Sequence, residues 1–404
     1  MSTAVTANPS PGAEERMLNA SMSGHNAAID TLRALAAGMV VLYHMNHFGL
    51  PVGPDEVVVL GALGVNMFFT LSGFLIGRAV LTPAVFDRPK YLRNRSLRIL
   101  PNYFICCFLM LFLVEPNTIA HATPWRLVFD LGAHAVLMHG WFGSISTSII
   151  GPLWTLSHEW IFYLLIGLVA PLLRSRRGWI VPLFMCVLAI TAKYLLMARA
   201  WSPSTGLSNP VCRWDQFALG IVGAQLSLMS GGWKNRSRWV MVAGIGGALL
   251  LAYCFYRQHA FAWTLHAKYV AEHAKPVSRD FAMKFDADFF RSRSNAVWFP
   301  WIFSTGMALL LLAFTSGFRR LDGWLKKTPF PWMGMVSYST YLYHAAVLIC
   351  LARGLRTAAE GTLFHDRRVA SVIVLFGVYA VSAFCFHYFE KPWLVRKASS
   401  PPAK

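Results

Sequence analysis

Ten stretches of this chain are each apolar over a length that can cross a lipid bilayer. A helix needs about 20 predominantly apolar residues to span the hydrocarbon core. We therefore predict an all-α polytopic membrane protein, a bundle of about ten transmembrane helices. The predicted spans are 29–49, 57–81, 97–114, 154–173, 178–198, 211–230, 239–256, 296–317, 331–352 and 369–389.

The composition of the chain argues against a water-soluble fold. Only 14% of the 404 residues are charged, whereas a soluble domain carries about 25%. The 37 Lys and Arg residues outnumber the 18 acidic ones, but they fall between the apolar stretches. This pattern favours cytoplasmic loops rich in positive charge over a nucleic-acid partner. The seven cysteines have neither a CxxC pair nor a metal-ligand spacing, so we expect no disulfide and no bound metal.

The basic residues also predict which segments cross the membrane. A weaker apolar segment, 126–143, contains Asp130, His134 and His139. If this segment does not cross and the N-terminus is inside, every basic cluster lies in the cytoplasm, as the positive-inside rule requires. We therefore predict a re-entrant or interfacial segment and two cytoplasmic termini. The clusters are 88–98, 174–177, 234–238, 319–327 and 391–404.

We expect no appended soluble domain, so any chemistry falls to the membrane helices. The predicted organisation is a disordered cytoplasmic tail over 1–27, a membrane domain over 28–395 and a cytoplasmic tail over 396–404. Within the membrane domain, 257–295 is predicted to form a polar and aromatic outer loop. Its rings are either interfacial anchors or surfaces on which sugars stack. They include Phe261, Trp263 and Tyr269.

The first span contains two ionisable side chains, Arg33 and His44. Eleven residues of helix return to within about 20° of the starting direction and rise about 16 Å, so both side chains share one face. Ionisable groups inside a membrane helix mark function by default. A cation near the cytoplasm and a general base at depth would suit an elongated anionic donor such as acyl-coenzyme A. The alternative is a snorkelling arginine and a histidine bonded to a neighbouring helix.

Two other patterns each have a structural and a functional interpretation. Four glycines lie in the span 57–81 beside Ser72, which is typical of close helix packing. Arg95 and Arg98 are i,i+3 neighbours on one helical face. Two guanidinium groups there suit phosphate oxygens, and an ordinary positive-inside cluster is the alternative.

Polar groups also lie in the spans 154–173 and 331–352. Glu159 follows Trp154 and leads into an apolar run, so it could orient a histidine or share its proton during base catalysis. The run from Ser337 to His344 includes Tyr341. It would line a path for an acceptor, or it would form hydrogen bonds between helices.

Six motifs occur in a fixed order along the chain. Together, over about residues 28–395, they resemble the acyltransferase 3 family of integral-membrane acyltransferases. The motifs are Arg33 with His44, the FF-x-LSGFLI run 68–76, Arg95 with Arg98, the W-x-L-S-x-E run 154–159, the SY-x-x-YL-x-H run 337–344 and the FE-x-P run 389–392.

The resemblance implies transfer of an acyl group, usually acetyl, from cytoplasmic acyl-CoA to a hydroxyl of an envelope glycan or another acceptor. It implies that His44 and Glu159 are catalytic, and that acetyl-CoA is the donor. The residues predicted to bind the donor are Arg33, Arg95 and Arg98. Those predicted to contact substrate are Ser72, Trp154, Tyr341 and His344. Many members have Asp where this chain has Asn66, so a charge at that position is not expected.

Several alternatives stay open at this level. His44 either activates the acceptor hydroxyl directly or carries the acyl group itself. The acceptor is a glycan, a lipid-linked saccharide or a small secreted metabolite, and the partners are membrane lipid and the machinery that assembles polysaccharides. A transporter or flippase of polysaccharide precursors, or a sensor or scaffold, would also need polar groups inside a helix bundle.

Overall fold

The computed structural model of the protein describes residues 26–50, 52–115, 123–198, 209–273, 285, 288–289, 291–356 and 366–398. Of the predicted tails, residues 1–25 and 399–404 lie outside these ranges. The predicted disorder of the N-terminal tail therefore stays a prediction.

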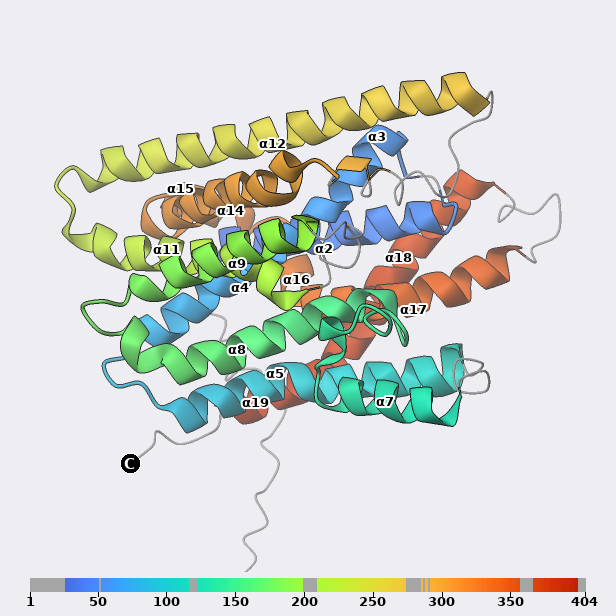
Figure 1. Ribbon diagram of the computed structural model, residues 1–404, viewed down its shortest axis with the longest axis horizontal. Helices are drawn as coiled ribbons and strands as arrows, with labels where there is room; N and C mark the ends of the chain where they lie inside the picture. The colour runs from blue at the N-terminus through green and yellow to red at the C-terminus, as the bar shows by residue number, and fades with distance from the viewer. Residues whose placement is uncertain are drawn as a thin grey trace, which may run out of the picture.

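Every regular element in the described ranges is a helix, and the long helices run roughly side by side (Figure 1). The long helices are α2 (Ala27–His47), α4 (Leu63–Leu81), α5 (Arg88–Leu109), α8 (Trp154–Leu173), α9 (Ile180–Ala198), α11 (Trp214–Met229), α12 (Arg236–His273), α14 (Arg293–Ser316), α17 (Ser337–Arg356) and α18 (Arg367–Cys385). The short helices are α3 (Asp55–Val58), η1 (Val59–Ala62), η2 (Met110–Val114), α7 (Pro124–Ala135), η3 (His139–Trp141), η4 (Gly151–Leu153), η5 (Pro210–Arg213), η6 (Ser230–Gly232), α15 (Arg319–Leu325), α16 (Phe330–Met335), η8 (Phe386–Glu390) and α19 (Lys391–Ala398).

The predicted all-α fold is confirmed, and each predicted span contains one long helix. In the part of the chain that the structure describes, seven segments are long and apolar enough to cross a membrane. The other three predicted spans contain α9, α11 and α17. Of these, α11 has 16 residues and α17 begins with a polar run, so the count of ten crossings stays a prediction. The seven segments are Ala27–His47, Val59–Leu81, Arg88–Val114, Gly151–Leu173, Arg236–Lys268, Asn295–Ser316 and Arg367–Val395.

The weak segment 126–143 forms the short helix α7, a turn and the single turn η3. The 12 residues of α7 reach only about 18 Å, too short for a hydrocarbon core of about 30 Å. Its polar side chains bind one another: Asp130 accepts from Ser148 and contacts His134 Nδ1 at 2.9 Å. Burial, with His134 beside it, lowers the pKa of His139 to about 3, so this imidazole is neutral at physiological pH.

The predicted outer loop 257–295 is wrong over its first part, because α12 continues as a helix to His273. Residues 257–273 contain no Gly or Pro to end the helix. The whole of α12 has 38 residues and extends about 57 Å along one edge of the bundle (Figure 1). The ring of Phe261 packs against Phe285 and Phe289, whereas Trp263 is 62% exposed.

Close contact between α4 and α11 accounts for two glycines. A Cβ atom on Gly73 would lie 2.1 Å from the carbonyl oxygen of Phe217, and one on Gly220 would lie 2.2 Å from that of Thr70. These two backbones therefore touch, as small residues allow in membrane helix pairs. The packing interpretation of the glycines in 57–81 is confirmed at this contact.

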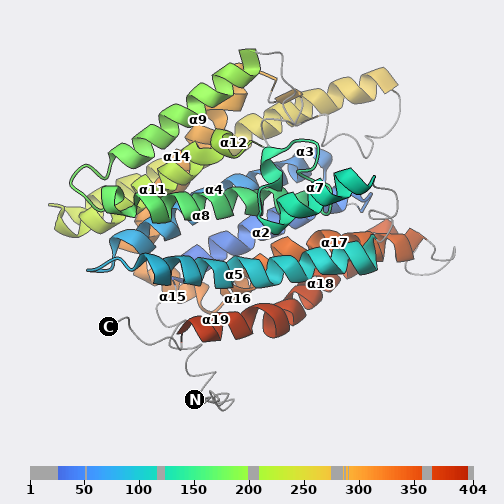
Figure 2. The same ribbon diagram turned by 60° about the horizontal axis from the view of Figure 1, so that its bottom comes forward.

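The connections rich in basic residues gather at one end of the bundle. The links after α4, α8 and α11 all lie on the left in Figure 1, and Figure 2 shows them on the left as well. Arg174 joins two of these links by donating to the carbonyl oxygens of Val80, Pro83 and Ala84. We refer to this end as the basic end.

Candidate active site

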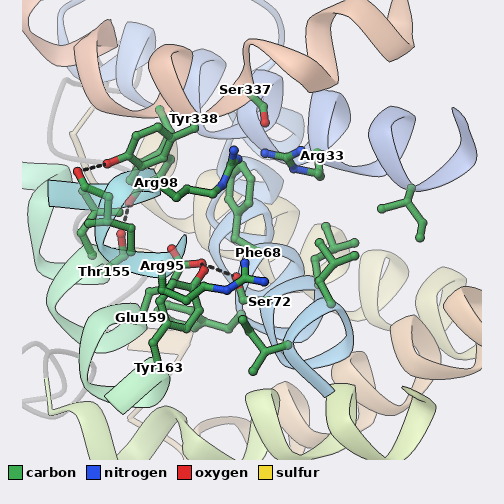
Figure 3. Close-up of a pocket in the computed structure, with 18 of the residues that line it drawn as sticks. Arg33, Phe68, Ser72, Arg95, Arg98, Thr155, Glu159, Tyr163, Ser337 and Tyr338 are labelled. Atoms are coloured by element: carbon green, nitrogen blue, oxygen red, sulfur yellow. Dashed lines mark hydrogen bonds between the residues drawn. The ribbon is translucent and has the colours of Figure 1, made fainter. Parts of the chain in front are cut away.

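A cavity of about 540 Å³ lies inside the bundle, with walls from α2, α4, α5, α8 and α17 (Figure 3). Its wall contains four arginines and two carboxylates, which leaves an excess of positive charge. The arginines are Arg33, Arg78, Arg95 and Arg98, and the carboxylates are Asp30 and Glu159. All three arginines predicted to bind the donor therefore meet in one space, although they come from two helices.

Arg33 and Arg98 point into the same part of the cavity, near Ser337 (Figure 3). Arg33 Nη1 lies 3.7 Å from Asp30 Oδ1, one turn earlier on α2. Arg98 Nη1 lies 3.4 Å from Oε1 of Glu390, a carboxylate buried outside the cavity wall. The paired carboxylates hold both guanidinium groups in place while other N–H groups of each fork stay available.

Arg95 lies between two aromatic rings, with its guanidinium carbon 5.7 Å from the ring centre of Tyr91 and 5.6 Å from that of Tyr163. These are cation–π distances. Its Nε atom is buried and has no hydrogen-bond partner among the described residues. A buried donor without a partner costs free energy, so a ligand acceptor would stabilise this arginine.

Glu159 is held by two hydroxyl groups. Its Oε1 accepts a 2.6 Å hydrogen bond from Ser72 Oγ and another from the Tyr163 hydroxyl, one turn along α8. Figure 3 shows Ser72, Glu159 and Arg95 grouped on one wall. Ser72, predicted to contact substrate, lines the cavity. Its hydroxyl group donates a hydrogen bond to Glu159.

Phe68, Thr155 and Tyr341 also line the cavity. Phe68 lies early in α4 and Thr155 at the start of α8, so both are farther from the basic end than Arg78, late in α4, and we refer to their part of the cavity as the deep end (Figure 1). The ring centres of Phe68 and Tyr341 are 5.4 Å apart. The Tyr341 hydroxyl donates to the carbonyl oxygen of Pro152 at 3.0 Å and accepts from Thr155 Oγ1 at 2.7 Å. These bonds fix the Tyr341 ring across the deep end of the cavity.

His44 and His344 lie just beyond this ring and do not line the cavity. The ring centres of Tyr341 and His344 are 5.9 Å apart, and His344 Nε2 is 3.3 Å from His44 Nδ1. Glu159 and His44 share no hydrogen bond among those described, so the predicted support of the His44 ring by Glu159 is not seen. The base nearest to His44 is His344. The sequence had predicted that His344 contacts the substrate.

Trp154, also predicted to contact substrate, is not among the residues that line the cavity. It packs on the guanidinium of Arg213, whose carbon lies 5.6 Å from the ring centre. Arg213 in turn donates to Asn66 Oδ1 at 3.2 Å. The neutral Asn66 therefore has a structural partner, and Trp154 covers a buried cation.

Sequence reasoning missed Arg78, and it gave no role to Glu390 although this residue belongs to the FE-x-P run. It also missed the buried ion pair of Lys193 and Asp215, at 2.5 Å. Each is a charge inside or next to an apolar stretch, which was the available signal. Arg78 lines the cavity and donates to Ser227 Oγ at 3.1 Å. Among the described residues, no group of three or more His, Cys, Asp and Glu side chains could hold a metal ion.

The bundle of apolar helices and its arginine-lined cavity are those of an integral membrane protein. The acyltransferase domain of the acyltransferase 3 family matches residues 26–388, nearly the whole chain. The protein belongs to this family, as the six motifs predicted, and is a membrane acyltransferase. No curated protein and no solved structure matches the chain.

Proposed function

We propose that this protein transfers an acetyl group from cytoplasmic acetyl-CoA to a hydroxyl of an envelope or secreted glycan. The observation that carries the proposal is the convergence of Arg33, Arg95 and Arg98 on one cavity. Guanidinium groups bind phosphate oxygens through paired, charge-assisted hydrogen bonds. A volume of about 540 Å³ is also in the usual range for small-molecule sites, about 300–1,000 Å³.

The donor would enter from the basic end. Its phosphates would bind the arginines, and its pantetheine arm would run along Phe68 toward Tyr341, at the deep end of the cavity. To reach His44, the thioester must pass between the rings of Phe68 and Tyr341. Because Thr155 and Pro152 hold Tyr341, we assign the movement to Phe68.

In the proposed reaction, His44 Nε2 takes the proton of the acceptor hydroxyl as its oxygen bonds to the thioester carbonyl carbon. The carbon–sulfur bond then breaks, and the proton passes from His44 to the leaving sulfur. The products are an O-acetyl ester and coenzyme A with a free thiol. This is general base catalysis followed by general acid catalysis by one imidazole.

The topology is part of the proposal. All ten long helices would cross the cytoplasmic membrane of a bacterium, with both termini and the basic end in the cytoplasm, where acyl-CoA is made. The acceptor, a glycan or lipid-linked saccharide, would approach the histidines from the opposite side. The enzyme would then work beside the machinery that assembles polysaccharides.

The test is a proton NMR count of base-labile O-acetyl groups on envelope and secreted glycans. The strains compared are a deletion, its complement with the wild-type gene, and complements with His44→Ala, Arg98→Ala or Arg126→Ala at equal membrane abundance. Arg126 is exposed and outside the cavity, so it serves as the matched arginine control.

We expect O-acetylation with wild type and Arg126→Ala, none with His44→Ala, and a loss of about tenfold or more with Arg98→Ala. Full O-acetylation with His44→Ala would overturn the catalytic assignment. A change in glycan quantity without a change in O-acetylation would instead favour a transporter.

A further inference from the structure

The imidazole pair beyond the cavity consists of His44 on α2 and His344 on α17. The two ring centres are 5.0 Å apart. His344 is completely buried, whereas His44 is only partly buried. His344 is thus inaccessible to a ligand, and its chemistry must act through its neighbour.

The backbone determines which nitrogen of His344 carries the proton. Nδ1 of His344 lies 2.7 Å from the carbonyl oxygen of Tyr341 and 3.2 Å from that of Thr340. A carbonyl oxygen only accepts, so Nδ1 must be the donor. In a neutral imidazole, Nε2 then carries the lone pair, and this lone pair faces His44 Nδ1 at 3.3 Å.

The same reasoning applies to His44. Its Nδ1 lies 2.9 Å from the carbonyl oxygen of Val40, so Nδ1 is protonated and also faces the lone pair of His344. One N–H shared between two acceptors is an ordinary three-centre hydrogen bond. Nε2 of His44 is therefore left unprotonated, in the form that a general base requires.

We infer that His344 is the positioning residue of His44: together with the carbonyl oxygen of Val40 it holds the His44 ring in the Nδ1–H tautomer, and it stabilises the imidazolium that forms when Nε2 accepts a proton. This inference rests on the proposed function, in which His44 is the base. The arrangement parallels other acid–base sites in which a third group orients the base through its second nitrogen. Here a neutral imidazole takes the place of the more usual carboxylate.

The test compares His344→Leu, which removes the acceptor at similar volume, with His344→Gln, whose amide oxygen can occupy the place of Nε2. His387→Leu is the control, because His387 is exposed and outside the site. Thiol release from acetyl-CoA is measured in inverted membrane vesicles that contain the native acceptor. Thermal unfolding of each purified variant checks the fold.

We expect His344→Leu to lower the rate at saturating acetyl-CoA by about 100-fold, with the KM for acetyl-CoA within about twofold. His344→Gln should recover about tenfold of this loss, since it restores the acceptor. Equal rates for the folded Leu variant and wild type would overturn the inference. So would folded Leu and Gln variants that are equally slow.

A second measurement does not depend on activity. The ring 15N signals of His44, assigned by their loss in His44→Asn, report its tautomer directly. Wild type should show a protonated Nδ1 and a bare Nε2. In His344→Leu the carbonyl oxygen of Val40 still accepts from Nδ1, so this tautomer should remain the major one while a measurable fraction of the other tautomer appears. An unchanged tautomer in His344→Leu would refute the role of His344 even if His44 proves catalytic. Conversely, activity in His44→Ala would refute the proposed function while this measurement still stands.

Discussion

Glu390 lies outside the cavity wall but forms an ion pair with Arg98, one of the arginines that line the cavity. Besides Arg98, its carboxylate accepts a 2.7 Å hydrogen bond from Ser339 Oγ. Asn102 lies within 3.4 Å of the same serine and accepts from the Tyr343 hydroxyl at 2.6 Å. The Arg98 guanidinium, which lines the cavity, is thus anchored to a buried polar network between α5, α17 and η8.

We expect Glu390→Gln to lower the free energy of unfolding by about 2 kcal/mol, because Arg98 loses its counter-charge while it stays largely buried. Asp366→Asn is the matched control: Asp366 is an exposed N-cap, and Asn caps a helix equally well. Thermal unfolding of both variants in one detergent gives the comparison. If Glu390→Gln unfolds with the control, the pair does not stabilise the fold.

Sequence could predict which residues carry the chemistry better than where they point. Arg33, Arg95 and Arg98 were recognisable because charges are costly inside apolar helices. Their meeting in one cavity depends on how α2 and α5 are rotated, which one helix alone does not determine. For the same reason the sequence could not predict that Trp154 and His344, expected to contact substrate, do not line the cavity. The pairing of Arg98 with Glu390, far apart in sequence, was not foreseen either.

At the scale of elements, the contact of α4 with α11 allows a direct test of packing. Gly73→Ala would place a methyl group against the backbone of Phe217, so the two helices must separate. We expect a loss of about 3 kcal/mol or more, as for other overpacked sites. Gly132→Ala on α7 is the control, because nothing lies within 4 Å of its added Cβ. Equal stability of the two variants would contradict the close contact.

The far part of α12, residues 257–273, is helical, and this can be tested by substitution. Thr264 is exposed and lies in the segment that apolar patterning had assigned to a loop. In a helix, Thr264→Pro should cost about 3 kcal/mol, since proline removes a backbone donor and clashes with the preceding turn. Thr264→Ala should be neutral or slightly stabilising. Spin labels at successive positions from 257 to 268 would show a 3.6-residue period, and similar stability of the Pro and Ala variants would indicate a loop instead.

For the whole molecule, the two ends of the bundle differ in charge and in reach. The arginine-rich connections lie at the basic end, and the arginines that line the cavity would bind a donor that enters there. At the other end, α12 has 38 residues, about 57 Å of helix, against a hydrocarbon core of about 30 Å. The pattern of apolar stretches predicted the number and order of the long helices, but it could not predict this asymmetry. Polar residues mark the limit of an apolar stretch and not the limit of a helix.

The orientation of the two ends in the membrane determines from which side the proposed donor can enter the cavity, and cysteine labelling can test it. In a background without native cysteines, we expect Arg176→Cys, in the α8–α9 connection, to react only with reagents that cross the membrane. Ala267→Cys, on the far part of α12, should react with impermeant maleimide added to intact cells. Both positions are exposed, so a difference in labelling reports sidedness, and permeabilised cells provide the reference. External labelling at position 176 with protection at position 267 would put the arginines toward the outside and exclude entry of acetyl-CoA from the cytoplasm at the basic end.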